Sequence, residues 1–240
     1  MHKTYLEHLD ELKRRILSVF LIFIGLTVIS YFFVDKIYNL LLLPLTEINT
    51  NQEVIYTSLP EVFLTYLAIS IRTSIALILP FIAYNIYMFI SPGLNSVERK
   101  IARIILFLSP CLFYLGMFFV FKFVIPNAWK FFLAFQQDNN NVRLLFKPKI
   151  SEYVSLSTEF LLAFGLAFQL PIILLILLLL KIISVQNLIK QRKIAIVVNF
   201  FIAAILTPPD VLSQFALAIP LLILYEISIL LGKFILKIKD

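Results

Sequence analysis

Apolar runs alternate with short polar stretches along almost the whole chain. An α-helix rises about 1.5 Å per residue, so a run of about 20 apolar residues crosses the roughly 30 Å hydrocarbon core of a bilayer. The pattern predicts an all-α integral membrane protein, one domain over residues 1–240, with six transmembrane helices. The expected spans are residues 16–34, 62–90, 104–125, 154–180, 194–206 and 211–231.

The fifth span is shorter than the rest. Ile194 to Leu206 contains only 13 residues, which cover about 20 Å as a helix. A segment shorter than the hydrocarbon core is accommodated by thinning of the bilayer, by snorkelling side chains or by oligomerisation. The sequence therefore predicts a short fifth and sixth helix, joined by residues 207–210, that thin the membrane beside them.

Composition and charge support a membrane protein and predict its orientation. Hydrophobic residues make up 61% of the 240 residues and charged residues only 15%, which excludes a soluble globular domain. Fourteen of the 21 basic residues fall at the two termini and in the loops after the second and fourth runs. By the positive-inside rule, both termini face the cytoplasmic side. The net charge of +7 thus reflects topology, and no basic patch with interleaved aromatic residues indicates a nucleic-acid partner.

Prolines interrupt the middle helices. Pro80 lies in the second expected helix, Pro110 and Pro126 lie in the third, and Pro171 lies in the fourth. An interior proline removes a backbone hydrogen bond and kinks the helix, so the kinked helices should form a concave body. Gln169 needs a hydrogen-bond partner at this depth, either among the carbonyls freed by the kink or in a polar patch of a membrane-facing concavity.

Three ionisable residues fall within the expected spans, where an unpaired charge is costly. Arg72 lies in the second helix, Lys122 in the third and Glu159 in the fourth. We expect an ion pair between Glu159 and Lys122, with Arg72 as the competing partner. The alternative is that the two basic side chains extend to the interface without specific partners.

Residues suited to catalysis are scarce. The two histidines, His2 and His8, precede the first span, and Cys111 is the single cysteine. The sequence has neither an HExxH metal motif nor a GxxxxGK[ST] phosphate-binding loop. It therefore indicates no enzyme, no metal site and no cofactor, and function must draw on binding, assembly or a transmembrane gradient.

Two carboxylates lie among the cytoplasmic bases. Glu11 stands four residues before Arg15, a spacing at which a helix brings opposite charges together. Glu98 follows the turn that joins the second and third helices. If Glu11 and Glu98 face one cavity, they form an acidic site for paired guanidinium groups, which bind carboxylates through two parallel hydrogen bonds.

Four motifs follow one another in a fixed order along the expected topology. They are His8-Leu9-x-Glu11-Leu12, Phe89-x-x-Pro92-Gly93-Leu94-x-x-x-Glu98-Arg99, Phe164-Gly165-x-x-Phe168-x-x-Pro171 and Leu206-Thr207-Pro208-Pro209-Asp210-x-x-Ser213-Gln214. With these motifs the sequence closely resembles the TatC family of the twin-arginine protein translocase, and the resemblance extends over nearly the whole chain.

The resemblance implies a receptor that binds signal peptides with consecutive arginines and, with single-span TatA- and TatB-type partners, moves folded proteins across a membrane by the proton motive force. It also implies a homo-oligomer within the complex, in a bacterial inner membrane or a mitochondrial inner or thylakoid membrane. The residues it assigns to signal-peptide binding are Glu11, Lys13, Arg15, Phe89, Glu98 and Arg99. Those it assigns to partner docking and translocation are Pro44 in the first external loop, Gln169, Thr207, Asp210 and Gln214.

Two positions depart from the family pattern, and two other functions compete with it. Many members have glutamate where this chain has Gln169, and arginine is common where it has Lys13. The alternatives are a small secondary transporter with an intramembrane polar site and a structural scaffold for another membrane complex. A transporter should have related halves, whereas the long second and fourth helices have no counterparts in the short fifth and sixth.

Overall fold

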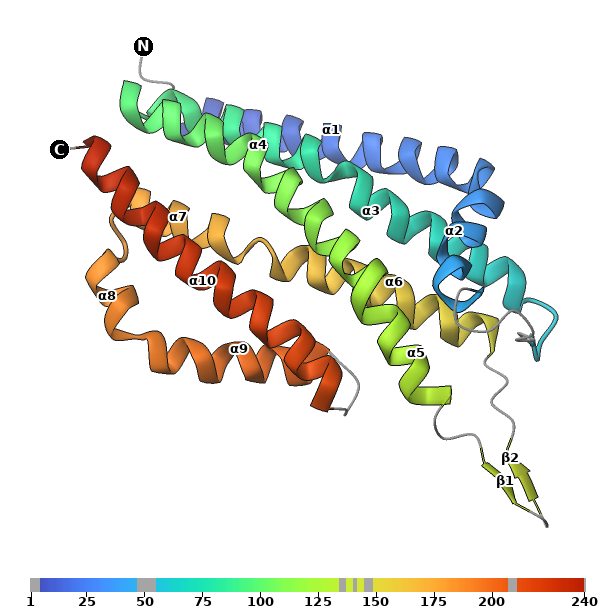
Figure 1. Cartoon of the computed structure of the whole chain (residues 1–240). Coiled ribbons are helices and arrows are strands. Elements are labelled where there is room, and N and C mark those ends of the chain that lie inside the picture. Colours follow the sequence, from blue (N-terminus) through green and yellow to red (C-terminus); the bar gives the residue numbers. More distant parts are fainter. Residues whose placement is uncertain are drawn as a thin grey trace.

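The computed structural model of the chain describes residues 5–46, 55–133, 137–139, 142–144, 149–206 and 211–239. Helices account for nearly all of them (Figure 1). The long helices are α1 (Tyr5–Phe32), α3 (Glu61–Ile90), α4 (Ser96–Phe119), α6 (Ile150–Ala167) and α10 (Val211–Lys239). The shorter ones are α2 (Val34–Thr46), α5 (Ile125–Leu133), α7 (Leu170–Leu179), α8 (Val185–Lys190) and α9 (Arg192–Leu206).

Five stretches of the described chain are long and apolar enough to cross a membrane, which confirms the expected all-helical membrane class. They are Leu9–Phe32, Glu61–Gly93, Glu98–Lys130, Ile150–Leu179 and Gln214–Phe234. The third stretch joins α4 to α5 through a π-helical turn, Val120–Val124, just before Pro126. The fifth expected span corresponds to α9, whose 15 residues are fewer than such a crossing needs. The expected short sixth helix is wrong, because α10 has 29 residues and its apolar stretch is long enough to cross.

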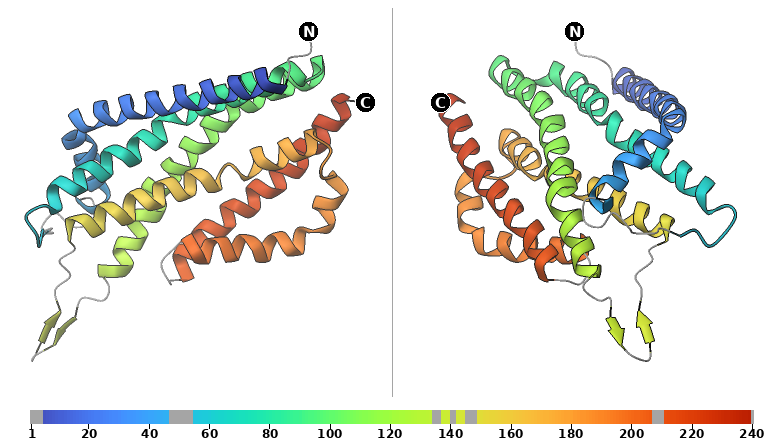
Figure 2. Two further views of the ribbon diagram at one scale, coloured as in Figure 1. Left: turned by 180° about the vertical axis from the view of Figure 1, so that it is seen from behind. Right: turned by 45° about the vertical axis from the view of Figure 1, so that its right-hand side comes forward.

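The long helices lie side by side, with both chain ends at the same end of the molecule (Figures 1 and 2). α1 packs along α3, α4 packs against α6, and α10 packs against α7 and α9. A short 3-10 helix, Ser91–Gly93, turns the chain from α3 into α4 at the end that carries the termini. Two short antiparallel strands, β1 (Gln137–Asn139) and β2 (Val142–Leu144), project from the opposite end.

The main core takes most of its buried side chains from α2, α5, α6 and α10, with the π-helical turn between α4 and α5, and aromatic side chains fill much of it. Trp129 stacks on Tyr153 with ring centroids 4.8 Å apart, and the Tyr153 hydroxyl donates a hydrogen bond to a carbonyl of α2. Gly116 and Gly165 allow α4 and α6 to approach closely, because a Cβ on Gly165 would lie 2.6 Å from the ring of Phe113. These contacts fix the position of α6 relative to α4.

Prolines affect the helices in different ways. α3 runs continuously through Pro80, and α4 runs continuously through Pro110. The fourth expected span is instead broken into α6 and α7 at residues 168–169, just before Pro171. Pro44 lies buried inside α2, which falls between the first two apolar stretches, so the segment expected as the first external loop is partly helical. The helix continues there because apolar residues on both sides of the proline pack into the core.

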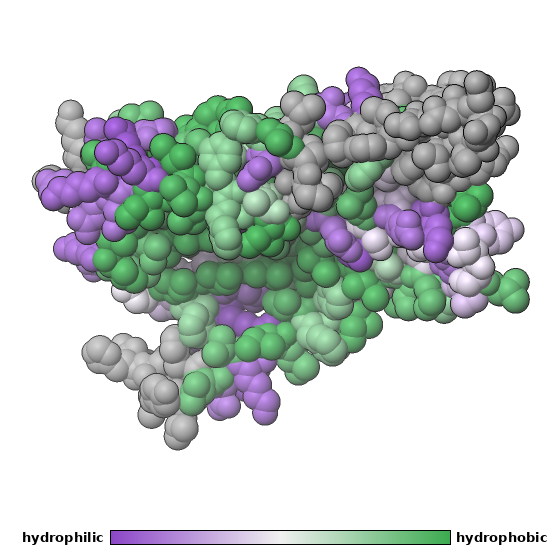
Figure 3. All heavy atoms as spheres, turned by 90° about the horizontal axis from the view of Figure 1, so that it is seen from below, coloured by the Kyte–Doolittle hydropathy of each residue, from purple (hydrophilic) through white to green (hydrophobic). Residues whose placement is uncertain are grey.

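The outward-facing surface of the helices is apolar. Figure 3 shows green, hydrophobic side chains over most of one face, with purple, hydrophilic side chains mainly towards two opposite edges and a hollow across the middle. Large apolar side chains with more than half of their surface exposed include Leu21, Phe32, Phe107 and Phe118. Such contiguous exposure is unfavourable in water but normal against lipid tails. The surface is therefore that of a protein embedded in a bilayer.

Candidate functional site

A recess opens between α1 and α3 near the end that carries the termini. It has a volume of about 270 Å³, and most of its lining is apolar. Its polar lining residues are Arg15 on α1 and Asn85 on α3. Phe89 lies one helical turn beyond Asn85 and lines the same recess. The recess therefore combines an apolar wall with a charged and an amide side chain.

Arg15 is held at this recess by contacts on both helices. Its Nη2 and Nε donate hydrogen bonds to Glu11 Oε1 at 2.6 and 3.2 Å, and its Nη1 donates to Asn85 Oδ1 at 3.4 Å. Asn85 in turn donates to the carbonyl of Phe81 at 2.9 Å. The expected pair of Glu11 and Arg15 is therefore confirmed, and each side chain is 21% exposed. Lys13 lies between them in the sequence and is exposed.

Glu98 lies in the first turn of α4, just beyond the turn that follows α3. Its Oε2 accepts a hydrogen bond of 3.2 Å from the Asn95 N–H, so the carboxylate caps the start of α4. Next to it, Arg99 Nη2 donates to the Ser91 carbonyl at 3.0 Å and ties the helix to the turn. These bonds give the turn a defined shape with Glu98 partly exposed on it.

Glu11 and Glu98 lie at the same end of the molecule, outside the lining of the recess. The first turns of α1 and α4 are both at the end that carries the termini (Figure 1). The recess is lined by Arg15 and Phe89 but by neither carboxylate. Glu11 accepts hydrogen bonds from Arg15 in its own helix, and Glu98 accepts one from Asn95 in its own turn. The structure thus offers two acidic points on separate elements at this end of the molecule.

Gln169 lies at the break between α6 and α7, and its amide is bound to α4. Its Nε2 donates to the Ser109 carbonyl at 2.9 Å, and the Ser109 hydroxyl donates to its Oε1 at 2.7 Å. One residue of the neighbouring helix therefore satisfies both ends of the amide. This is a packing contact between two helices, beside Pro110, and the carbonyl is that of Ser109 rather than one freed by the kink at Pro171.

The hairpin formed by α9 and α10 is held by polar as well as apolar contacts. Gln214 Nε2 donates to a carbonyl of α9 at 3.2 Å. Arg192 Nη2 at the start of α9 lies 2.7 Å from Glu226 Oε2 on α10. The connection between the helices, which contains Thr207 and Asp210, lies outside the described residues.

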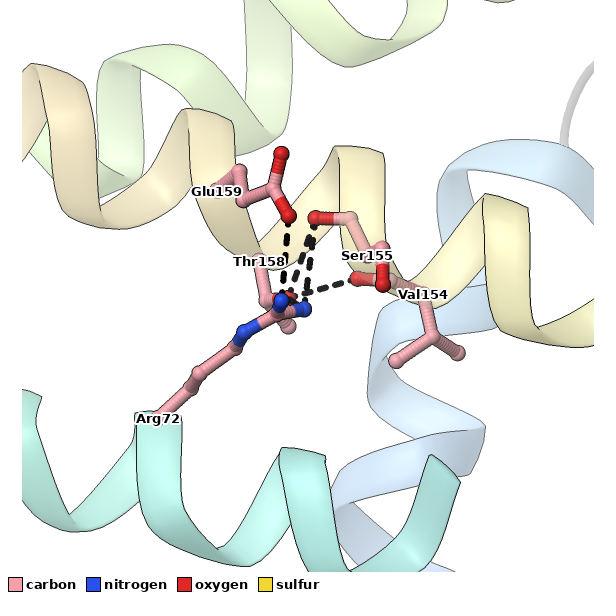
Figure 4. A network of polar contacts seen from close by, with 5 residues as sticks. All are labelled: Arg72, Val154, Ser155, Thr158 and Glu159. Carbon is pink, nitrogen blue, oxygen red and sulfur yellow. Dashed lines mark hydrogen bonds and ion pairs between the residues drawn. The ribbon is translucent and has the colours of Figure 1, made fainter. Parts of the chain in front are cut away.

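A polar network joins α3 to α6 in the half of the molecule away from the termini (Figure 4). Arg72 Nη2 donates to Glu159 Oε1 at 3.0 Å, and Arg72 Nη1 donates to Thr158 Oγ1 at 2.7 Å. Glu159 therefore pairs with Arg72, and the expected pair with Lys122 is wrong. The reason is the rotation of α6 about its axis, which turns the face that carries Thr158 and Glu159 towards α3 rather than towards α4. Lys122 lies in the π-helical turn, with its Nζ 6.0 Å from the ring centroid of Phe121.

Sequence reasoning missed the partners of these functional side chains. Asn85 could have been found, because a polar residue four positions before Phe89 shares its helix face. The partnership of Ser109 with Gln169 joins residues 60 positions apart and leaves no periodic trace in the sequence. Among the described residues, no group of three or more His, Cys, Asp or Glu side chains could hold a metal ion.

The family model of the Sec-independent protein translocase protein (TatC) matches residues 7–220 of the chain. A Sec-independent protein translocase protein TatC of Rickettsia prowazekii is 51% identical over 234 residues, which cover 97% of this chain and 93% of that protein. The TatC protein of Desulforapulum autotrophicum is 39% identical over 238 residues, which cover 98% of this chain and 86% of that protein. A crystal structure of the twin arginine translocase receptor TatC in DDM matches with a TM-score of 0.79 and 34% identity, over 94% of this chain and 99% of that one. The chain therefore belongs to the TatC family of multi-pass membrane proteins.

Proposed function

We propose that this chain is the receptor subunit of a twin-arginine protein translocase. It binds signal peptides with consecutive arginines and, with TatA- and TatB-type single-span partners, passes folded proteins across an energy-transducing membrane by the proton motive force. The observation that carries the proposal is the presence of two carboxylates, Glu11 and Glu98, on separate elements at the end that bears both termini. The family consists of translocase components rather than enzymes.

Both carboxylates already hold a donor that an incoming guanidinium can replace. At Glu11 that donor is the side chain of Arg15, and at Glu98 it is the Asn95 N–H. Exchange of one donor for another keeps each carboxylate partnered, so binding avoids the cost of an unsatisfied charged group. Two oriented acidic points suit a ligand with two adjacent arginines better than a ligand with one. The apolar wall at Phe89 suits an apolar side chain next to the arginines.

Six spans with both termini on the cytoplasmic side follow from this proposal. The termini lie at the same end as the turn that precedes the basic residues Arg99, Lys100 and Arg103. A concentration of basic residues at one end supports a cytoplasmic, matrix or stromal position for that end. α9 then crosses as a short fifth span in addition to the five long ones. The hollow in Figure 3 supports a concave body.

α9, the first helix of the hairpin, is short enough to thin the bilayer and to favour contacts with partner helices, whereas the 29 residues of α10 are enough for an ordinary span. The 15 residues of α9 cover only about 22 Å, well below the roughly 30 Å hydrocarbon core. Thinning and association with other helices both relieve such a mismatch. The same mismatch supports assembly of several copies within the complex. A thinner membrane next to the hairpin lowers the barrier that a folded cargo has to cross.

Crosslinking of an Arg-Arg signal peptide to the chain in native membranes tests the receptor proposal. Glu98→Gln keeps the size of the side chain and its ability to cap α4 but removes the charge. A hydrogen bond to a charged group contributes roughly 1.5–3 kcal/mol, so we expect crosslinking to fall at least about tenfold. Glu152→Gln on α6 is the matched control, because this exposed carboxylate lies at the opposite end. It should crosslink like the unchanged chain.

A Lys-Lys version of the same peptide controls for the guanidinium groups, since a lysine cannot bind a carboxylate through two parallel hydrogen bonds. It should crosslink weakly to every variant. If Glu98→Gln and Glu11→Gln both insert normally and crosslink the Arg-Arg peptide as well as the unchanged chain does, neither carboxylate is the arginine site.

A further inference from the structure

The polar network between α3 and α6 lies far from the proposed signal-peptide site. Arg72 precedes Asn85 by 13 residues on α3, which places it about 20 Å along the helix from the recess. Arg72 and Glu159 nevertheless lie within long apolar stretches that cross the membrane. Ionised side chains at such depth are costly and are retained where they bind something. The pair is therefore a candidate binding site in its own right.

Part of the hydrogen-bonding capacity of this pair is unused. Arg72 Nη1 donates to Thr158 Oγ1 at 2.7 Å and to the Ser155 carbonyl at 3.5 Å, and its Nη2 donates to Glu159 Oε1 at 3.0 Å. The Thr158 hydroxyl in turn donates a hydrogen bond to the Val154 carbonyl at 2.6 Å (Figure 4). Among the described residues, Arg72 Nε and Glu159 Oε2 have no hydrogen-bond partner. A guanidinium has five donors and a carboxylate about four acceptor positions, so both can take a further ligand.

The pair is also exposed on the surface of the membrane domain. The side chain of Glu159 is 61% exposed and that of Arg72 is 24% exposed, whereas Thr158 beneath them is buried. An ion pair that faced only hydrocarbon would be unfavourable, because the carboxylate would lose its hydration without a full set of replacements. The ligand must therefore offer polar groups to both members of the pair.

An apolar cavity of about 220 Å³ adjoins the pair and limits the shape of the ligand. Helices α2, α3, α4 and α6 line it with side chains such as Leu40, Leu77 and Leu161, and Arg72 and Thr158 form its polar end. Leu40 and Leu77 are about half exposed, so the cavity opens towards the lipid. Most of its lining is apolar. It fits one flexible hydrocarbon chain.

We propose that Arg72, Glu159 and this cavity form a binding site for one phospholipid whose headgroup carries a primary amine, as in phosphatidylethanolamine. The lipid phosphate accepts hydrogen bonds from the guanidinium of Arg72, and the ammonium group donates to Glu159 Oε2. One acyl chain enters the cavity. The bound lipid bridges α3 and α6 and completes the polar contacts of both charges.

The choice of headgroup follows from the two opposite charges of the site. A headgroup with phosphate alone would satisfy Arg72 but place a second negative charge beside Glu159. A choline headgroup carries a positive charge but has no N–H to donate. A protein partner would have to bring a cation, an anion and an apolar group to the site at the same time. An amine-bearing phospholipid meets both charges and the cavity together.

Native mass spectrometry of the purified chain tests the proposal without signal peptide or partner proteins. The delipidated chain is equilibrated in detergent with equimolar phosphatidylethanolamine, phosphatidylcholine and phosphatidylglycerol that share the same acyl chains. We expect at least fivefold more retained phosphatidylethanolamine than phosphatidylcholine. Glu159→Gln should reduce this preference to less than twofold, and Arg72→Gln should reduce retention of all three lipids. Glu152→Gln, a carboxylate change two turns earlier on α6, should behave like the unchanged chain.

Leu77→Trp gives a second route if Arg72→Gln fails to fold, as judged by its melting temperature. The larger side chain fills the cavity and leaves both charges in place, so total retention of lipid should fall severalfold. Equal retention of the three lipids by the unchanged chain overturns the proposal and is the result expected for a protein occupant. A preference for phosphatidylglycerol also overturns it, as does a preference for phosphatidylethanolamine that survives Glu159→Gln.

Discussion

Replacement of Gly116 by alanine tests whether the close packing of α4 on α6 holds the membrane domain together. A Cβ at this position would lie 2.8 Å from the Phe164 carbonyl oxygen and 2.8 Å from the ring of Phe168. The first neighbour is backbone and cannot turn aside as a side chain can. Relief of the contact therefore requires the two helices to move apart, which also loosens the neighbouring contact of Gly165 with Phe113.

Two opposing effects determine the change in the free energy of unfolding. Alanine in place of glycine stabilises a helix by up to about 1 kcal/mol. Overpacking of a filled interior destabilises by about 1–3 kcal/mol, and a backbone contact belongs in the upper part of this range. The net destabilisation is then about 1–2 kcal/mol. In a chain of this size it lowers the melting temperature by about 2–8 °C.

Thermal unfolding in detergent, followed by the fluorescence of the single tryptophan, Trp129, measures this change. Gly25→Ala on α1 is the matched control, because a Cβ there has no heavy atom within 4 Å. Only the gain in helix propensity remains at that position, so its melting temperature should stay the same or rise. If Gly116→Ala melts as high as Gly25→Ala, the close approach of α4 and α6 does not contribute to stability and the reasoning is refuted.

Three further changes address other contacts. Glu61→Gln weakens the hydrogen bonds that the carboxylate accepts from the N–H and the hydroxyl of Ser151, at 3.4 and 2.6 Å. The melting temperature should fall by a few degrees. An unchanged value would show that the contact between α3 and α6 does not depend on these bonds. Gln169→Leu leaves Ser109 without its partner and should destabilise by about 1–2 kcal/mol in the same assay. If the loss of unfolding free energy is no larger than that caused by a leucine substitution at an exposed position, the hydrogen bonds between Gln169 and Ser109 do not stabilise the fold. Insertion of about five apolar residues into 194–206, enough to restore an ordinary span, should impair export of a folded reporter. Normal export would limit the hairpin to partner docking.

Interactions within one helix could be predicted from the sequence, whereas the choice of partner between helices could not. Glu11 and Arg15 meet because four residues return a helix to the same face. Glu159 had two candidate partners at similar depth, Arg72 and Lys122. The choice between them depends on the rotation of α6 about its axis and on the π-helical turn that contains Lys122. Hydropathy carries no information on either.

The five long apolar stretches were predictable, because hydropathy and length can be read from the sequence directly. The helix around Pro44 was not, since proline disfavours a helix interior and the apolar contacts of α2 with the core outweigh that preference. The break at Gln169 was expected from Pro171, but the bond to Ser109 that stabilises it joins two helices. In the candidate site, the acidic residues were predictable by type and their separate environments were not.

Glu98 has two roles that compete, because it caps α4 and is the proposed contact for an arriving arginine. A guanidinium that draws the carboxylate away from Asn95 leaves that N–H to water and loosens the first turn of the helix. Part of the binding free energy then goes into local unwinding, which keeps affinity moderate and makes release easy. Arg99 is tied to the same turn, so it moves when the turn loosens. Binding of a signal peptide at Glu98 would thereby loosen the first turn of α4, a helix that continues into the membrane.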